Sequence, residues 1–114
     1  MSLWKWNDVE LEVDMEDVDF LEKYEMAFQK MELKEEELKN IGKISGFAKK
    51  YCMMFWELFD GIFGDGTSNK LFNGKYNMRI CEECYDSFLF FCKKQTTEAN
   101  KNRDSRYKKY KVKK

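Results

Sequence analysis

The densest apolar run of the chain is YCMMFWELFDGIF, residues 51–63, and this run decides the fold. Apolar side chains recur at helical spacing at Tyr51, Phe55 and Leu58, which predicts a helix that begins near Ser45. Apolar residues also fill the other sides of this helix: Met53, Met54, Trp56, Phe59 and Phe63. A helix that is apolar on nearly all sides either lies at the centre of its domain or is shared with another subunit. The sequence leaves both alternatives open.

The same run does not predict a membrane-spanning segment. Glu57, Asp60 and Gly61 interrupt it, and a spanning helix needs about 20 apolar residues. The chain has 114 residues, of which 43% are apolar and 17% aromatic, so one packed domain is expected. No secretory signal opens the sequence, and we therefore expect a cytoplasmic location.

The N-terminal residues predict a β-hairpin. Trp4 and Trp6 alternate with polar residues before Asn7-Asp8, and apolar residues alternate again from Val9 to Val13. Two runs with a period of two residues around a two-residue turn are typical of a hairpin. Because an isolated hairpin is only marginally stable, one of its faces is expected to pack on the helices.

Another helix is predicted from Asp17 to about Asn40. Apolar residues from Leu21 to Met31 recur on one side of this segment among glutamates and lysines. Asp17 or Asp19 can serve as the N-cap, and Gly42 is a natural stop after the C-terminal end.

A third helix is predicted from about Tyr76 to Lys94, after a glycine-rich connection over residues 61–74. The sequence as a whole predicts a mainly α protein. Residues 1–98 are expected to form a single three-helix domain with an N-terminal β-hairpin, and residues 99–114 a basic C-terminal extension.

The formal net charge of the chain is zero, but the charges are unevenly distributed. Residues 99–114 contain eight basic residues and one acid, a net charge of +7, which leaves −7 for residues 1–98. Such a tail can dock on an acidic protein surface, including that of a second copy, or on nucleic acid, where Tyr107 and Tyr110 can stack on bases. Its candidate binding residues are Lys101, Arg103, Arg106, Lys108, Lys109 and Lys111.

Cys81 and Cys84 have the two-residue spacing of many metal and redox motifs. The chain has no histidine, so only Cys52 and Cys92 could complete a zinc site. The favoured interpretation is that these cysteines are small apolar residues facing the core. Without histidine, no serine or cysteine has the usual base for nucleophilic catalysis. We therefore predict no catalytic residue, no cofactor and no metal site, and a protein that is not an enzyme.

Two motifs point to a family: FWELFDGIFGDGT at residues 55–67 and LFNGKYNM at residues 71–78. With the N-terminal tryptophan-containing strand, they resemble small proteins encoded in the tail modules of phages and prophages of Gram-positive bacteria. The resemblance covers roughly residues 4–95 and leaves out the basic tail. Within the motifs, Gly64 and Gly66 permit a sharp exit from one helix, and Asn77 is expected to cap the next.

The resemblance implies a tail assembly chaperone-like role in the bacterial cytoplasm. Such a protein would help the tape measure protein and the tail tube to assemble, and it could also associate with itself. The apolar surplus of the central helix supplies the expected binding residues for a hydrophobic tail component: Met53, Met54, Trp56, Phe59 and Phe63. The alternative function is a small regulator that binds nucleic acid through the basic tail.

Overall fold

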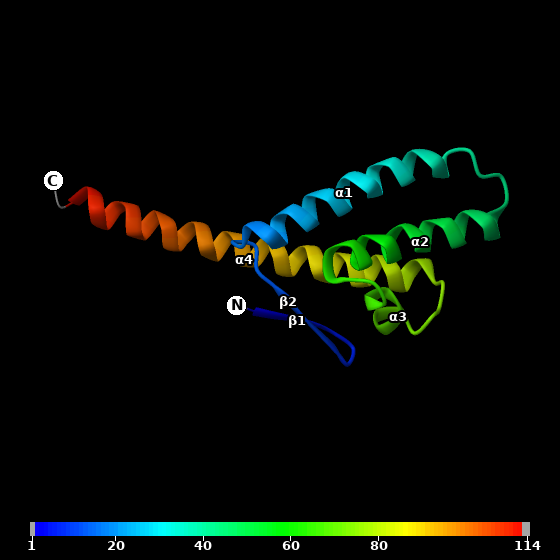
Figure 1. Ribbon diagram of the computed structural model, residues 1–114, viewed down its shortest axis with the longest axis horizontal. Helices are drawn as coiled ribbons and strands as arrows, with labels where there is room; N and C mark the ends of the chain where they lie inside the picture. The colour runs from blue at the N-terminus through cyan, green and yellow to red at the C-terminus, as the bar shows by residue number, and fades with distance from the viewer. Residues whose placement is uncertain (1, 113–114) are drawn as a thin grey trace.

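The computed structural model describes residues 2–112 and consists of a β-hairpin followed by helices (Figure 1). The elements are β1 (Ser2–Trp6), β2 (Val9–Val13), α1 (Val18–Leu38), α2 (Ile44–Phe63), α3 (Thr67–Phe72) and α4 (Met78–Val112). The predicted class, mainly α with an N-terminal hairpin, is confirmed. None of the helices between residues 2 and 112 has the length and the apolar composition that crossing a bilayer requires.

The hairpin has the predicted position and register. Trp4 pairs with Leu11 and Trp6 with Val9, and the turn residue Asn7 has a φ of 54°. Asparagine tolerates this left-handed conformation better than most residues, which explains why the turn forms without glycine. The hairpin buries Trp4, which is 2% exposed, against the helices.

Helix α2 is central in the domain. Its buried residues are Cys52, Met54, Phe55, Leu58, Phe59 and Ile62. The Trp4 ring stacks on the Phe59 ring, with their centroids 5.6 Å apart, and lies 5.1 Å from the Phe88 ring of α4. On the other side, a Cβ at Gly61 would lie 3.2 Å from the Ala27 Cβ, so glycine permits α1 to approach closely. The first of the two alternatives for the apolar helix is therefore confirmed.

The glycine-rich connection contains α3, where only a turn-rich segment was predicted. Gly64 and Gly66 have φ values of 111° and 91°, which favour glycine. The Asp60 carboxylate accepts hydrogen bonds from the Ser68 backbone N–H, at 2.8 Å, and from the Ser68 hydroxyl, at 3.0 Å. The Thr67 hydroxyl donates to the Gly64 carbonyl at 2.7 Å. Residues 59–67, the second half of the FWELFDGIFGDGT motif, thus build the α2–α3 corner together with Ser68.

Capping residues set the starts of α1 and α4 as predicted. The Asp17 carboxylate accepts a hydrogen bond from the Phe20 N–H, and the Asn77 side-chain oxygen accepts one from the Ile80 N–H, both at 3.0 Å. Helix α1 ends at Leu38, two residues before the predicted end.

Helix α4 is much longer than predicted. It continues 18 residues beyond Lys94, because residues 78–112 contain neither glycine nor proline. Basic residues near its C-terminal end also stabilise the helix through a favourable interaction with the helix dipole. The molecule is correspondingly elongated, with extents of 65 × 31 × 22 Å. In Figure 1 the C-terminal part of α4 projects from the body as a single helix.

Candidate partner-binding surfaces

The five residues predicted to bind a hydrophobic partner do not form one exposed surface. Met54 and Phe59 are 3% and 0% exposed, so both side chains belong to the core rather than to an exposed apolar face of α2. Met53, Trp56 and Phe63 are only half-buried. The reason is that α1, α3, α4 and the hairpin together cover the sides of α2 that the sequence left unassigned.

Met53 and Met54 nevertheless line a groove, which lies between α1 and α2. Two adjoining depressions of about 660 and 210 Å³ form it, and they share Lys34, Glu37, Met54 and Glu57. Its apolar lining residues are Met26, Ala27, Met31, Leu33, Leu38, Ile41, Met53, Met54 and Leu58. Met26 and Leu33 on its rim are 59% and 68% exposed. We call this feature the methionine groove.

Charged side chains of both signs line both walls of the methionine groove. On α1 they are Lys23, Lys30, Lys34 and Glu37, and on α2 they are Lys50, Glu57 and Asp60. An amphipathic helix could lie in such a groove, because apolar anchors would meet the floor and charged residues of either sign would find a partner on the rim.

The opposite flank of α1 has a different character. Two adjoining depressions of about 440 and 580 Å³ run along α1 towards α2 and α4, and they share Met31, Glu35 and Tyr85. Their carboxylates are Glu25, Glu32, Glu35, Glu82 and Asp86, and no lysine or arginine among the described residues lines them. None of these five carboxylates takes part in an ion pair within residues 2–112. We call this feature the acidic groove.

The pKa values of two tyrosines in the acidic groove are raised, first by burial and then by the carboxylates around them. The Tyr51 hydroxyl donates a hydrogen bond to the Glu82 carboxylate at 2.7 Å. Burial, that hydrogen bond and the nearby charges of Glu82, Glu35 and Asp86 raise the pKa of Tyr51. Burial and the charges of Glu35 and Asp86 also raise the pKa of Tyr85. A cation or a cationic side chain would be favoured in this groove.

Residues 99–112 of the predicted basic tail are the last part of α4, and the expected boundary at residue 99 lies inside that helix. Ala99 is 6% exposed, and Arg103 reaches the body through its ion pair with Glu16, at 2.6 Å. The projecting part therefore begins after Arg103 rather than at residue 99. We call residues 104–112 the arm.

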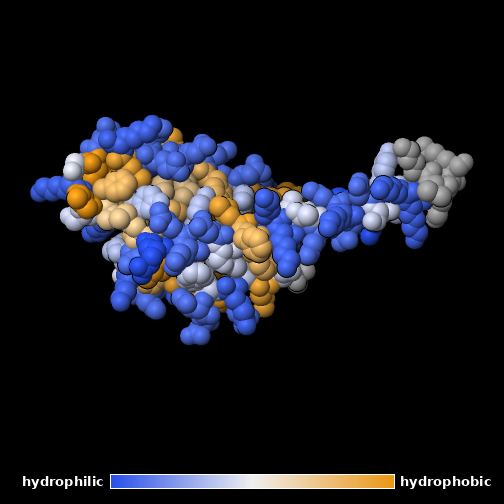
Figure 2. Space-filling view, turned by 180° about the vertical axis from the view of Figure 1, so that it is seen from behind, coloured by the Kyte–Doolittle hydropathy of each residue, from blue (hydrophilic) through white to orange (hydrophobic). Residues whose placement is uncertain are grey.

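Most of the predicted tail residues are exposed. Lys101, Arg106, Lys108 and Lys109 are all exposed, whereas Arg103 is engaged with Glu16 and with Asn100. The Lys111 side chain, like Lys113 and Lys114, lies outside the part that the structure describes. In the space-filling view of Figure 2 the arm is covered by hydrophilic side chains.

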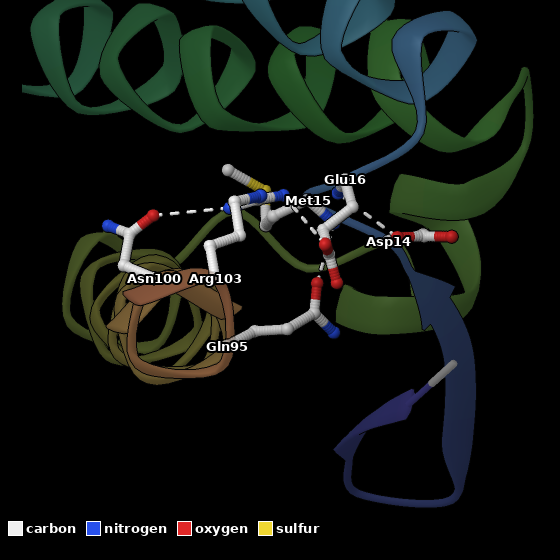
Figure 3. Close-up of polar contacts among 6 residues, drawn as sticks. All are labelled: Asp14, Met15, Glu16, Gln95, Asn100 and Arg103. Atoms are coloured by element: carbon white, nitrogen blue, oxygen red, sulfur yellow. Dashed lines mark hydrogen bonds and ion pairs between the residues drawn. The ribbon is translucent and has the colours of Figure 1, made fainter. Parts of the chain in front are cut away.

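Gln95 anchors α4 to the body, a role that the sequence did not reveal. Its side-chain oxygen accepts a hydrogen bond from the Met15 N–H at 2.6 Å (Figure 3). Its side-chain N–H donates to the Val13 carbonyl at 2.8 Å. The available signal was the spacing Phe88, Cys92, Gln95 and Ala99, which continues the buried stripe of α4 through one polar residue. Together with Arg103, Gln95 fixes the direction in which the arm leaves the body.

The four cysteines are free and face the core, as the favoured interpretation predicted. Burial raises the pKa of Cys92 to about 12, and burial together with the nearby Cys52 raises that of Cys81 to about 12. Thiols of this kind are poor nucleophiles and poor metal ligands at neutral pH. In the described part of the chain, no group of three or more cysteine and acidic side chains is placed to hold a metal ion.

These thiols predict a loss of stability at alkaline pH. In the unfolded chain the Cys81 and Cys92 thiols ionise near their ordinary pKa of 9.0, whereas in the folded protein they keep their protons to about pH 12. Below pH 9 both states keep these protons, so the two thiols leave the free energy of unfolding level. Between about pH 9 and 12 the unfolded state binds fewer protons than the folded state. The free energy of unfolding should therefore fall there, by up to about 1.4 kcal/mol per pH unit for each thiol.

Urea unfolding at a series of pH values measures this dependence. The variant Cys92→Ala should show a shallower fall, because it has one buried thiol fewer. A wild-type free energy of unfolding that stays level from pH 8 to 11 would contradict the prediction.

Comparison with known proteins identifies the chain at the level of its family. No curated protein and no solved structure matches it significantly. The sequence pattern of one family, described as a family of unknown function, DUF6673, matches residues 7–114. This match includes the whole of α4 and the arm. The chain belongs to the DUF6673 family of unknown function.

Proposed function

We propose that this protein is a non-enzymatic assembly factor of a phage or prophage tail module, similar to a tail assembly chaperone. In this proposal it holds an apolar helical segment of a tail component, such as the tape measure protein, in the methionine groove while the tail is built in the host cytoplasm. The observation that carries the proposal is that groove, in which four methionines, Met26, Met31, Met53 and Met54, line two adjoining depressions between two helices.

The chemistry of the groove suits a temporary hold on variable apolar sequences. Methionine side chains are flexible and polarisable, and they adapt to apolar partners of different shape. The exposed Met26 and Leu33 lie seven residues apart on α1, so they present two apolar contacts along one side of the helix. Such a surface is costly to leave in water and gains free energy when an apolar helix covers it.

The resemblance of the FWELFDGIFGDGT and LFNGKYNM motifs to phage and prophage tail-module proteins supports the class of partner. The structure gives these motifs a role in the fold, because Asp60 and the two glycines form the α2–α3 corner beside the groove. The motifs therefore support a scaffold shared with the tail-module proteins, and the methionine groove supports the binding role.

Co-expression with the tape measure protein of the same phage or prophage, followed by a pull-down, tests the proposal. Wild-type protein should capture the tape measure protein. The double variant Met26→Glu with Leu33→Glu should lose about tenfold or more of this capture, because it places carboxylates on the rim of the apolar floor.

The matched control is Val18→Glu with Ile44→Glu. These two residues are 67% and 86% exposed and lie outside the groove, so the control adds the same charge and removes similar apolar surface. Control protein should capture as well as wild type. Equal loss in both variants, or no capture by wild type, would refute the proposal.

A further inference from the structure

The arm and the acidic groove are complementary in charge. By sequence, residues 104–112 contain Arg106, Lys108, Lys109 and Lys111 against Asp104, a net charge of +3. The acidic groove presents five carboxylates and no basic residue among those described. Charges of opposite sign on two surfaces of one protein attract a second copy and orient it.

The two surfaces also match in their aromatic residues. Tyr107 and Tyr110 on the arm are 65% and 60% exposed, and their spacing of three residues places them on one side of the helix, next to Arg106. The acidic groove contains Tyr24, Tyr51 and Tyr85 beside its carboxylates. Arginine and lysine side chains bind both carboxylates and tyrosine rings, so a basic helix with two tyrosines suits this lining.

The arm cannot reach the groove of its own chain. Glu82 and Asp86 of the groove lie in the first turns of α4, and the arm lies in the last turns of the same uninterrupted helix. At 1.5 Å per residue, Asp86 and Arg106 are about 30 Å apart along the axis. Gln95 and Arg103 hold the intervening turns against the body, so α4 cannot bend back there.

We infer that the arm of one copy docks in the acidic groove of a second copy. The contact is head-to-tail, because the arm and the groove are different surfaces, so successive copies form a ring or an open chain. This contact uses the flank of α1 opposite the methionine groove. It goes beyond the proposed function and stands whether or not the methionine groove holds a tail component.

Sedimentation velocity of the full chain over a dilution series, at low and high salt, tests the inference. Wild-type protein should associate as its concentration rises, and high salt should weaken the association about tenfold or more. The groove variant Glu35→Lys with Asp86→Lys should lose association. The arm variant Arg106→Glu with Lys109→Glu should lose it as well. All four residues are exposed, and circular dichroism checks that both variants keep the fold.

Mixing the two variants gives the decisive result. The intact arm of the groove variant then meets the intact groove of the arm variant, so the mixture should associate although neither variant does so alone. The control Glu12→Lys with Glu98→Lys reverses two exposed acids outside the groove and should associate like wild type.

Three results would overturn the inference. The first is a wild type that stays monomeric at every concentration, and the second is a mixture that does not regain association. The third is a groove variant that associates normally while the wild-type arm binds labelled single-stranded DNA with steep salt dependence, which would assign the arm to nucleic acid. None of these results bears on the capture of a tail component, which depends on Met26 and Leu33.

Discussion

Phe88→Ala should lower the free energy of unfolding by about 3–5 kcal/mol, the largest single loss that we expect. Phe88 is fully buried, and its ring lies 5.1 Å from the Trp4 ring, 5.5 Å from the Phe59 ring and 5.7 Å from the Phe63 ring. Truncation removes the contact at which the hairpin, α2 and α4 meet and leaves a cavity there. Urea unfolding, followed by tryptophan fluorescence and by circular dichroism, measures the loss.

Phe90→Ala is the matched control, since Phe90 lies two residues further along the same helix and is 70% exposed. Its free energy of unfolding should differ from that of wild type by less than about 0.5 kcal/mol. A similar loss for the two variants would mean that the cluster around Trp4 is not the core of the domain.

Gln95→Ala should lower the free energy of unfolding by about 2–3 kcal/mol. The change removes one small side chain, but it leaves the Met15 N–H and the Val13 carbonyl without their partners, and Val13 is fully buried. Because both groups belong to the passage from β2 to α1, hydrogen exchange at Met15 should also accelerate.

The variant Gln95→Glu distinguishes the contributions of the two hydrogen bonds to the free energy of unfolding. A carboxylate can still accept from the Met15 N–H but cannot donate to the Val13 carbonyl, so its loss should fall between those of wild type and Gln95→Ala. Gln29→Ala is the control, because Gln29 is exposed on α1 and should tolerate the change. An unchanged stability in Gln95→Ala would contradict the anchoring role of this side chain.

The sequence predicted the elements whose signals are local. The alternation at Trp4 and Trp6 places the hairpin correctly, and the capping residues Asp17 and Asn77 mark the starts of α1 and α4. These signals depend on a few neighbouring residues and on backbone geometry. They can therefore be read without knowledge of the tertiary structure.

The candidate surfaces depend on how distant elements pack, and here the sequence was less informative. It could not show that Met54 and Phe59 would be covered from several sides, nor that α1 would have a basic flank at Lys23 and an acidic one at Glu35. The length of α4 could not be predicted from hydrophobic periodicity, because the segment after Lys94 is polar. The helix is favoured there by the absence of glycine and proline rather than by an apolar stripe.

Methyl NMR of the chain's seven methionines tests the proposed binding site most directly. Met26 and Met53 line the methionine groove, whereas Met78, 37% exposed at the start of α4, lies outside it and serves as an internal control. When an apolar helical segment of the tape measure protein is added, the Met26 and Met53 signals should shift while the Met78 signal stays in place. Signals of Met26 and Met53 that do not move, or a shift confined to Met78, would contradict the proposal that the methionine groove holds the tail component.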